Sequence, residues 1–134
     1  MKTHRIKVLI VDCDEDVLIT FERLLEDEGY DTTTAWTGQD GLKALQGQVF
    51  DLVLVNEYLS DLDTELFISG LRHRGGNVPF IVMQPSATAR KSDIGRFLAA
   101  GAVAVVCKSS QTKLLEAVSA QVSPTSPMRM QRAA

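Results

Sequence analysis

Four short segments carry side chains that could do chemistry together, and each of them directly follows an apolar run. They are Asp12-Cys13-Asp14, Asn56-Glu57, Gln84-Pro85-Ser86 and Cys107-Lys108-Ser109. If the apolar runs are parallel strands, their carboxyl ends meet at one edge of a sheet, which we call the rim. The rim then holds carboxylate, thiol, amide and ammonium groups. A lone carboxylate beside an ammonium group is suited to an ion pair.

The segment FDLVLVNEYLSD, residues 50–61, delivers an amide to this rim. Leu52 to Val55 form a continuous apolar run, as expected for a strand that is covered on both faces, and Asn56 follows directly. A side-chain amide is neither an acid nor a base. Its oxygen is also a poor nucleophile, because its lone pairs are delocalised. The sequence therefore places a chemically inert polar group at the end of its central strand.

Apolar residues recur at strand and helix spacing in alternation along the chain. We expect strands at residues 6–11, 30–35, 52–55, 80–83 and 102–106. We expect helices at residues 14–28, 38–46, 63–73, 87–100 and 110–122. Thr37 is expected to cap the second helix, and Gly29 and Gly101 to end the first and the fourth. In the third helix, the residues expected to face inward are Leu66, Phe67 and Leu71.

Five strands that alternate with five helices predict an α/β fold, with a doubly wound parallel sheet and helices on both faces. A nucleotide- or flavin-binding protein of this architecture needs a glycine-rich turn after the first strand. Residues 12–16 instead carry four negative charges, which repel phosphate. The sequence also shows no Ser/His/Asp set, no metal-spaced Cys/His cluster and no P-loop, so we do not expect an enzyme.

The composition fits one soluble domain. The chain has 134 residues, a formal net charge of −3 and no basic stretch, which argues against nucleic-acid binding. The apolar run after residues 1–5 is too short for a signal peptide or a membrane span, so we expect a cytoplasmic protein. Cys13 and Cys107 do not make a disulfide framework and are expected to be reduced.

Four blocks of the sequence resemble the receiver domain of bacterial response regulators, the fold shared with the chemotaxis regulator. The blocks are KVLIVDCDEDVLITFERLLEDEGYDTTTAWTGQDGLKAL, FDLVLVNEYLSDLD, NVPFIVM and AGAVAVVCKSS. The resemblance covers residues 5–122 and implies a flavodoxin-like fold with the strand order 2-1-3-4-5. Residues 123–134 hold two prolines and several small residues, and are expected to form a disordered tail.

The resemblance also implies roles for the rim positions. In that family an acidic pair after the first strand binds Mg²⁺, and an aspartate ending the third strand accepts a phosphoryl group. A Ser or Thr after the fourth strand and a Lys after the fifth contact that group. Asp12 and Lys108 match the pattern. The positions that depart from it are Cys13, Asn56, Gln84 and, where many members carry a switching aromatic residue, Val105.

These departures predict an atypical receiver with no catalytic residue and no phosphorylation at Asn56. We expect Mg²⁺ binding to be lost or weak, because Asp12 is the remaining family-type ligand and the thiol of Cys13 is too soft for magnesium. We expect Asp12 to pair with Lys108, and Gln84 to hydrogen-bond Asn56 or Asp12. Gln84 lacks the short hydroxyl group, and Val105 lacks the aromatic ring, that take part in the conformational switch of the family. The domain is therefore expected to rest in one conformation.

Residues near the rim have simpler interpretations. Asp61 and Asp63, in the loop after Asn56, are expected to be solvated loop and helix-cap residues. Cys13 and Cys107 remain open as a redox pair, although free cysteines are more often small buried apolar side chains. Surface positions without a special role are expected for His4, His73, Arg90, Lys91 and Arg96.

We therefore expect a stand-alone receiver-like domain that acts by protein–protein contact in two-component signalling, since the chain ends soon after the fifth helix. Its partners would be signalling proteins, such as a histidine kinase or an output protein, or a second copy that docks through the fourth helix, fifth strand and fifth helix. Neither nucleic acid nor membrane is an expected partner. Two alternatives stay open: phosphorylation on another carboxylate, and a redox- or ligand-sensing α/β protein.

Overall fold

The structure is a computed structural model, and it describes residues 5–85 and 91–122. Its strands are β1 (Lys7–Val11), β2 (Asp31–Ala35), β3 (Leu52–Asn56), β4 (Phe80–Gln84) and β5 (Ala104–Cys107). Its helices are α1 (Glu15–Asp27), α2 (Gly38–Gly47), α3 (Thr64–Gly75), α4 (Lys91–Ala99) and α5 (Gln111–Gln121). The predicted ends that fall in the described residues agree with these to within two residues. The predicted start of the fourth helix, and the predicted tail, lie outside the described residues.

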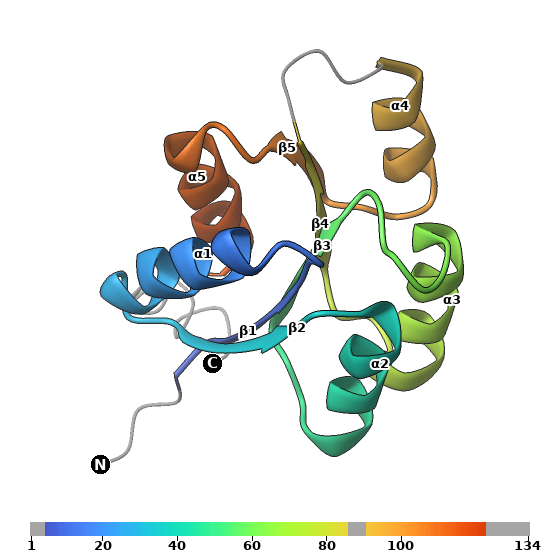
Figure 1. Ribbon diagram of the computed structural model, residues 1–134, viewed down its shortest axis with the longest axis horizontal. Helices are drawn as coiled ribbons and strands as arrows, with labels where there is room; N and C mark the ends of the chain where they lie inside the picture. Colours follow the sequence, from blue (N-terminus) through green and yellow to red (C-terminus); the bar gives the residue numbers. More distant parts are fainter. Residues whose placement is uncertain (1–4, 86–90, 123–134) are drawn as a thin grey trace, which may run out of the picture.

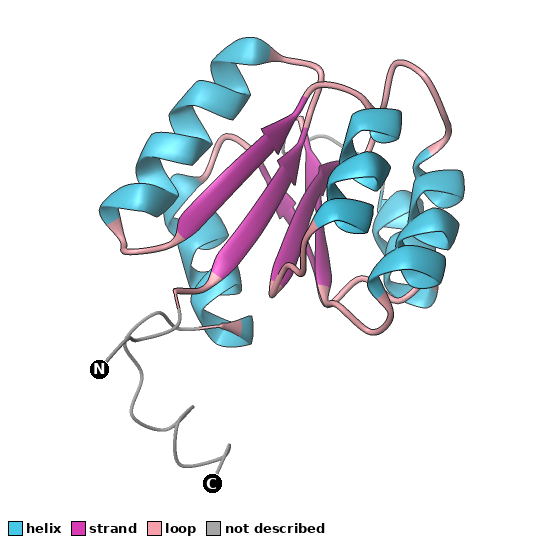
Figure 2. Cartoon of the chain, turned by 90° about the horizontal axis from the view of Figure 1, so that it is seen from below, coloured by secondary structure: helices cyan, strands magenta, loops and turns pink. Residues whose placement is uncertain are grey.

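The five strands form one parallel sheet in the order β2-β1-β3-β4-β5. Figure 2 shows the sheet between its two layers of helices. Helices α1 and α5 cover one face, and α2, α3 and α4 cover the other (Figure 1). This arrangement confirms the predicted doubly wound fold and its strand order. Because every strand pair is parallel, all five carboxyl ends lie at the same edge, where the rim was expected.

The strands bury side chains on both faces, which gives the protein two apolar clusters. The α2–α4 cluster includes Val11, Val53, Val55, Phe67, Phe80, Val82 and Phe97. The α1–α5 cluster includes Ile10, Leu18, Phe21, Leu52, Leu54, Met83 and Leu114. Every residue of β3 is buried, which explains its continuous apolar run. The threonine-rich β2 lies at the edge of the sheet, where side chains of intermediate polarity are tolerated.

The helix ends follow local sequence signals. Asp14 and Thr37 accept backbone N–H groups at the starts of α1 and α2, so the predicted cap at Thr37 is confirmed. Ser110 does the same for α5. Gly29 and Gly101 follow α1 and α4 with φ angles of 95° and 111°, which favour glycine. Both helices therefore end just before a glycine, which can adopt the left-handed backbone conformation.

One predicted orientation is wrong. Leu66 is 62% exposed, whereas Phe67 and Leu71 are fully buried. The inward stripe of α3 is set by Thr64, Phe67, Ile68 and Leu71, which recur at three- and four-residue spacing. Leu66 lies about 100° around the helix from Phe67, beyond that stripe. Among the helices of the described ranges, none combines the length and apolar character needed to cross a membrane.

Candidate functional site

Asp12 and Lys108 form an ion pair at the rim, with Lys108 Nζ 2.9 Å from Asp12 Oδ2. The side chain of Asp12 is fully buried, and that of Lys108 is 13% exposed. The other carboxylate oxygen, Oδ1, accepts the backbone N–H of Asp14 at 3.0 Å. Both oxygens of this buried carboxylate are therefore satisfied, as a buried charge requires. The predicted ion pair is confirmed.

The pleat of the sheet explains how these two residues meet. Strands β3 and β4 lie between β1 and β5, so the two backbones are not neighbours. Ile10 and Val106 both face the α1–α5 side. Asp12 and Lys108, each two residues further on, continue the same alternation. The long side chain of Lys108 can therefore cross the ends of the intervening strands to reach the carboxylate.

Asn56 is the last residue of β3 and is 7% exposed. Its Nδ2 donates a hydrogen bond to the carbonyl oxygen of Tyr58 at 2.7 Å. Its Oδ1 is buried and has no hydrogen-bond partner among the described residues. The donated hydrogen bond ties the end of β3 to the loop that follows it.

Gln84, the last residue of β4, is buried, but it does not make the predicted hydrogen bond to Asn56 or Asp12. Its Nε2 donates instead to Oε2 of Glu57 at 3.2 Å. The prediction was wrong about the direction of the side chain. The interaction therefore ties β4 to the start of the β3–α3 loop and not to the ion pair.

Strand alternation gives the physical reason for that difference. Gln84 continues the series of Phe80 and Val82, which faces the α2–α4 side. Asn56 continues the series of Leu52 and Leu54, which faces the α1–α5 side. The two amides therefore project from opposite faces of the sheet. Glu57, one residue after Asn56, projects toward the same side as Gln84.

The two cysteines lie on different strands and are both free. Cys13 is exposed and Cys107 is partly buried, so the expectation of buried thiols is wrong for Cys13. Three strand spacings of about 4.8 Å separate β1 from β5, whereas a disulfide needs Cα atoms within about 7 Å. A disulfide between the two cysteines of one chain is incompatible with this fold.

Cys107 has a local partner of its own. Its Sγ lies 2.9 Å from Oγ of Ser109. Hydrogen bonds with the Ser109 side chain and backbone, helped by the charge of Lys113 and opposed by burial, lower the pKa of the Cys107 thiol. The thiolate is therefore easier to form here than in an isolated cysteine.

Asp61, in the β3–α3 loop, is a helix cap for another part of the chain. Its carboxylate accepts the backbone N–H groups of Gly38 at 2.8 Å and Gln39 at 2.9 Å, at the start of α2. Desolvation acts to raise the pKa of Asp61, but the hydrogen bonds from Gln39, Gly38 and its own loop outweigh it and lower that pKa. Asp61 is thus an exposed loop residue that also caps a helix, in agreement with the expectation of solvated loop and helix-cap residues.

Gly38 permits this loop to pack closely on α2. A Cβ atom at this position would lie 2.8 Å from Cδ1 of Leu62 and 3.2 Å from Cδ1 of Leu59. Asp63 occupies the N-cap position of α3, as predicted, but makes no side-chain capping bond. Thr64 instead holds the loop, since its Oγ1 donates to the carbonyl oxygen of Glu57 at 2.7 Å.

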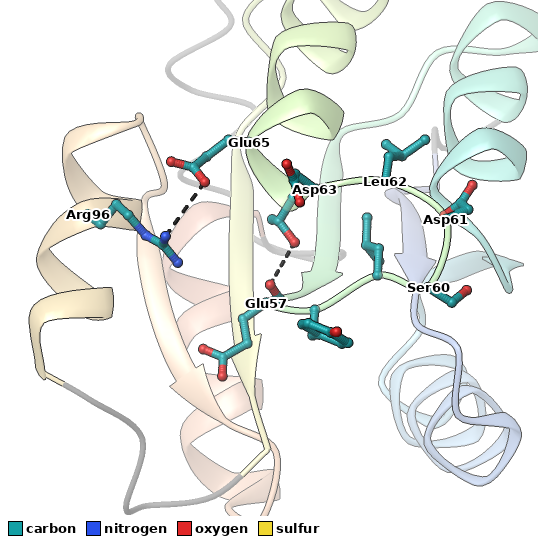
Figure 3. A pocket seen from close by; sticks show the side chains of 10 residues that line it. Glu57, Ser60, Asp61, Leu62, Asp63, Glu65 and Arg96 are labelled. Atoms are coloured by element: carbon teal, nitrogen blue, oxygen red, sulfur yellow. Dashed lines mark hydrogen bonds and ion pairs between the residues drawn. The ribbon is translucent and has the colours of Figure 1, made fainter.

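A pocket of about 440 Å³ opens beside this loop (Figure 3). It is lined by residues 57–65 and by Arg96 of α4, and neither Asn56 nor the ion pair lines it. Its lining includes four carboxylates and one guanidinium group. Arg96 lies 3.7 Å from Glu65 and 3.5 Å from Asp93, so it is a paired surface residue and not simply a solvated one.

Val105 and His73 do not line this pocket. Val105 is partly buried and packs against the α2–α4 cluster. His73 is exposed, as expected. Lys91 is the first residue of α4, and His4 and Arg90 lie outside the described residues.

Sequence comparison places the chain among signalling proteins. A family model described as the response regulator receiver domain matches residues 8–119. The chain is 31% identical to the transcriptional regulatory protein AfsQ1 of Streptomyces coelicolor over 112 residues, which is 82% of the chain and 48% of the relative. It is 32% identical to the transcriptional regulatory protein PrrA of Mycobacterium tuberculosis over 72% of the chain and 40% of the relative. The chain thus spans less than half the length of these curated relatives.

Solved structures of receiver-type proteins have the same fold as this chain. A CheY-like receiver domain protein of Methanospirillum hungatei aligns with a TM-score of 0.78 and 27% identity, over 87% of this chain and 93% of that one. The chemotaxis protein CheY4 of Vibrio cholerae aligns with a TM-score of 0.80 over 89% of this chain and all of that one. At 20% identity, the second likeness supports the fold alone.

Proposed function

From its membership of the response regulator receiver domain family, we propose that this chain is an atypical receiver. It acts by contact with other signalling proteins and is not phosphorylated at Asn56. The observation that carries the proposal is the amide at the end of β3. Phosphoryl transfer to this position requires an anionic oxygen. Asn56 offers a neutral amide instead, and its nitrogen donates a hydrogen bond to the carbonyl oxygen of Tyr58.

The rim residues do not fit the magnesium site that the family implies. Mg²⁺ prefers oxygen ligands, usually one or two carboxylates with water. Both oxygens of Asp12 are engaged by Asp14 and Lys108, and Cys13 supplies an exposed thiol. Within the described ranges, no group of three or more His, Cys, Asp or Glu side chains could hold a metal ion. We infer that magnesium binding is lost or weak.

The positions of the switch residues support a domain with one resting conformation. Gln84 is anchored to Glu57, and its amide is on the opposite side of the sheet from Asn56. Val105 has no ring to rotate and packs against the α2–α4 cluster. A partner would then recognise the surface that the domain always presents.

Intact-mass measurement after incubation with acetyl phosphate and Mg²⁺ tests this proposal. We expect no phosphoryl adduct on the natural chain. The double variant Cys13→Asp/Asn56→Asp restores two family-type carboxylates, and an acid-labile, hydroxylamine-sensitive adduct on it would show that the assay works in this fold. A stable adduct on the natural chain would overturn the proposal.

Phosphorylation on another carboxylate is the nearest rival, and Glu57 is the residue that the geometry favours for it. Glu57 follows Asn56 directly, is half-buried and lines the pocket. Peptide mapping of any adduct on the natural chain, repeated with Glu57→Gln, decides between this rival and the proposal. An adduct that disappears in Glu57→Gln establishes the rival.

A further inference from the structure

We propose that the pocket beside the β3–α3 loop, together with the exposed rings of Trp36 and Tyr58, binds an arginine-bearing segment of a partner protein. This inference rests on the proposed function, because it names the chemistry of the partner that the receiver contacts. It is carried by two features of the described residues: two exposed aromatic side chains on loops that pack together, and an excess of carboxylates in the pocket.

Trp36 and Tyr58 are close in the sequence to residues that form a tight packing contact. Tyr58 is 75% exposed and Trp36 is 51% exposed. Trp36 lies two residues before Gly38, and Tyr58 directly precedes Leu59, which packs against Gly38. Asp61 fastens this contact through its hydrogen bonds to Gly38 and Gln39. The two exposed rings are therefore carried by two loops that pack against each other, and neither ring belongs to the apolar clusters of the described residues.

Among the residues that the structure describes, the lining of the pocket next to Tyr58 carries more negative than positive charge. Glu57, Asp63 and Glu65 line it together with Arg96. Asp63 makes no side-chain capping bond. From the described residues, the carboxylate of Glu57 accepts one hydrogen bond, from the neutral amide of Gln84. Arg96 and Glu65 are 3.7 Å apart and more than half exposed, so this pair is weak. Within the described part of the chain, one guanidinium group therefore faces these three carboxylates in this lining.

Figure 3 shows how these groups are arranged. Glu57 and Glu65 both project toward the side of the pocket where α4 brings Arg96, whereas Asp61 lies at the other end of the loop, toward α2. Asp61 is already used by the start of α2. The free charge is thus concentrated at the end of the pocket that Glu57 and Glu65 share.

An arginine side chain matches this surface better than other ligands. Its planar guanidinium group pairs with carboxylates and also stacks on the faces of Tyr and Trp rings. Nucleic acid and anionic lipid would be repelled by the same carboxylates. An uncharged apolar segment would gain from the rings but would bury the carboxylates without partners. The charge of the pocket therefore selects a cationic segment.

The test is a titration with a fluorescent peptide, Ac-Gly-Arg-Ala-Arg-Gly-amide, followed by anisotropy. The same peptide with citrulline in place of arginine is the uncharged control of matched shape. We expect the arginine peptide to bind more tightly than the citrulline peptide, and its binding to weaken as salt is raised. Trp36 is the single tryptophan of the chain, so its fluorescence should change on binding.

Variants locate the binding on this surface. Tyr58→Ala should raise the Kd about three- to fivefold, through loss of the cation–π contact. Asp63→Asn should raise it about two- to fivefold, and it removes no hydrogen bond of the described structure. Matched controls are Val49→Ala, an exposed apolar residue in the α2–β3 connection, and Glu116→Gln, an exposed carboxylate on α5. Both controls should leave the Kd unchanged.

Equal affinity for the two peptides would overturn the proposal, as would equal Kd values for Tyr58→Ala, Asp63→Asn and the controls. The titration contains neither acetyl phosphate nor Mg²⁺. A phosphoryl adduct in the mass experiment would refute the proposed function without affecting this result. A failed titration without an adduct would refute only the chemistry assigned to the partner.

Discussion

At the scale of single residues, Asn56 differs from an aspartate by its NH₂ group, and this group forms a hydrogen bond with the loop that follows β3. Its Nδ2 donates to the carbonyl oxygen of Tyr58 at 2.7 Å. A carboxylate cannot donate this bond and would place negative charge against the carbonyl oxygen. The local backbone is therefore matched to an amide, and the change from acid to amide is coupled to the conformation of residues 56–58.

Asn56→Asp alone should destabilise the fold by about 1–3 kcal/mol at neutral pH, because a bonded donor is replaced by a buried charged acceptor. The loss should shrink at acid pH, where the new carboxyl group is protonated and can donate. Urea unfolding at several pH values measures it. Asn77→Asp, at an exposed site, is the matched control and should change little. Equal stability of Asn56→Asp and the natural chain would remove the role assigned to the Tyr58 hydrogen bond.

Lys108→Met should be more damaging, because it leaves the fully buried carboxylate of Asp12 without its cation. Breaking one partner of a buried ion pair costs about 3–5 kcal/mol. Denaturant unfolding at neutral pH measures this cost, with Lys113→Met on the exposed surface of α5 as control.

The double variant Asp12→Asn/Lys108→Met separates the penalty of an unpaired charge from lost packing. We expect it to be more stable than Lys108→Met, since no buried charge remains. A double variant that is less stable than Lys108→Met would show that the ion pair is not the source of the loss.

At the scale of elements, the β3–α3 loop is held by a cap that it supplies to α2. Asp61→Ala should cost about 1 kcal/mol, because two N–H groups of the first turn lose their acceptor. Asp63→Ala, two residues further on, is the matched control, since Asp63 makes no capping bond. Thermal unfolding of the two variants compares them. Equal losses would contradict the capping role of Asp61.

The same cap gives a pH dependence with a definite sign. The pKa of Asp61 is lower in the folded protein, so its stabilisation is present above its unfolded pKa and is lost as pH falls through its folded pKa. The difference in unfolding free energy between the natural chain and Asp61→Asn should therefore decrease toward acid pH. A difference that stays constant with pH would show that the charge of Asp61 does not contribute.

Helix caps can be predicted from the sequence where the capping residue is next to the helix, and are missed where it is distant in the chain. Thr37 was predicted to cap α2 because it immediately precedes that helix. Asp61 caps the same helix from 23 residues away, and no spacing rule connects it to Gly38. The direction of the Gln84 side chain is predictable from the sequence. The two-residue alternation of β4 places it on the face of the sheet opposite Asn56.

At the scale of the whole molecule, the fold followed from the sequence because many weak signals agree. Four apolar strands, a threonine-rich edge strand and five helices alternate along the chain and fix the layers. The strand order then brings Asp12 and Lys108 to one rim. The pocket could not be predicted in the same way. It depends on how a loop packs on α2 and on where α4 places Arg96, which are tertiary contacts with no repeating pattern.

Tyr30 joins distant ends of the fold, and its ionisation tests how much that contact stabilises the molecule. Its hydroxyl donates to the carbonyl oxygen of Val122 at 3.1 Å, linking the start of β2 to the end of α5. Tyr30→Phe removes this buried bond and should cost about 1 kcal/mol at neutral pH. Burial, helped by the charge of Glu28, raises the pKa of Tyr30. The contribution is therefore complete below the unfolded pKa and is lost as pH rises through the folded pKa.

The natural chain should consequently lose stability at alkaline pH more steeply than Tyr30→Phe, as measured by urea unfolding across that range. The chain has two tyrosines, so Tyr58→Phe leaves Tyr30 as the sole source of tyrosinate absorbance. In that variant the absorbance should rise together with unfolding, because the ionised hydroxyl cannot donate to Val122 and its charge is not accommodated in the buried site. Tyrosinate that forms while the protein remains folded would show that the link between β2 and α5 is dispensable.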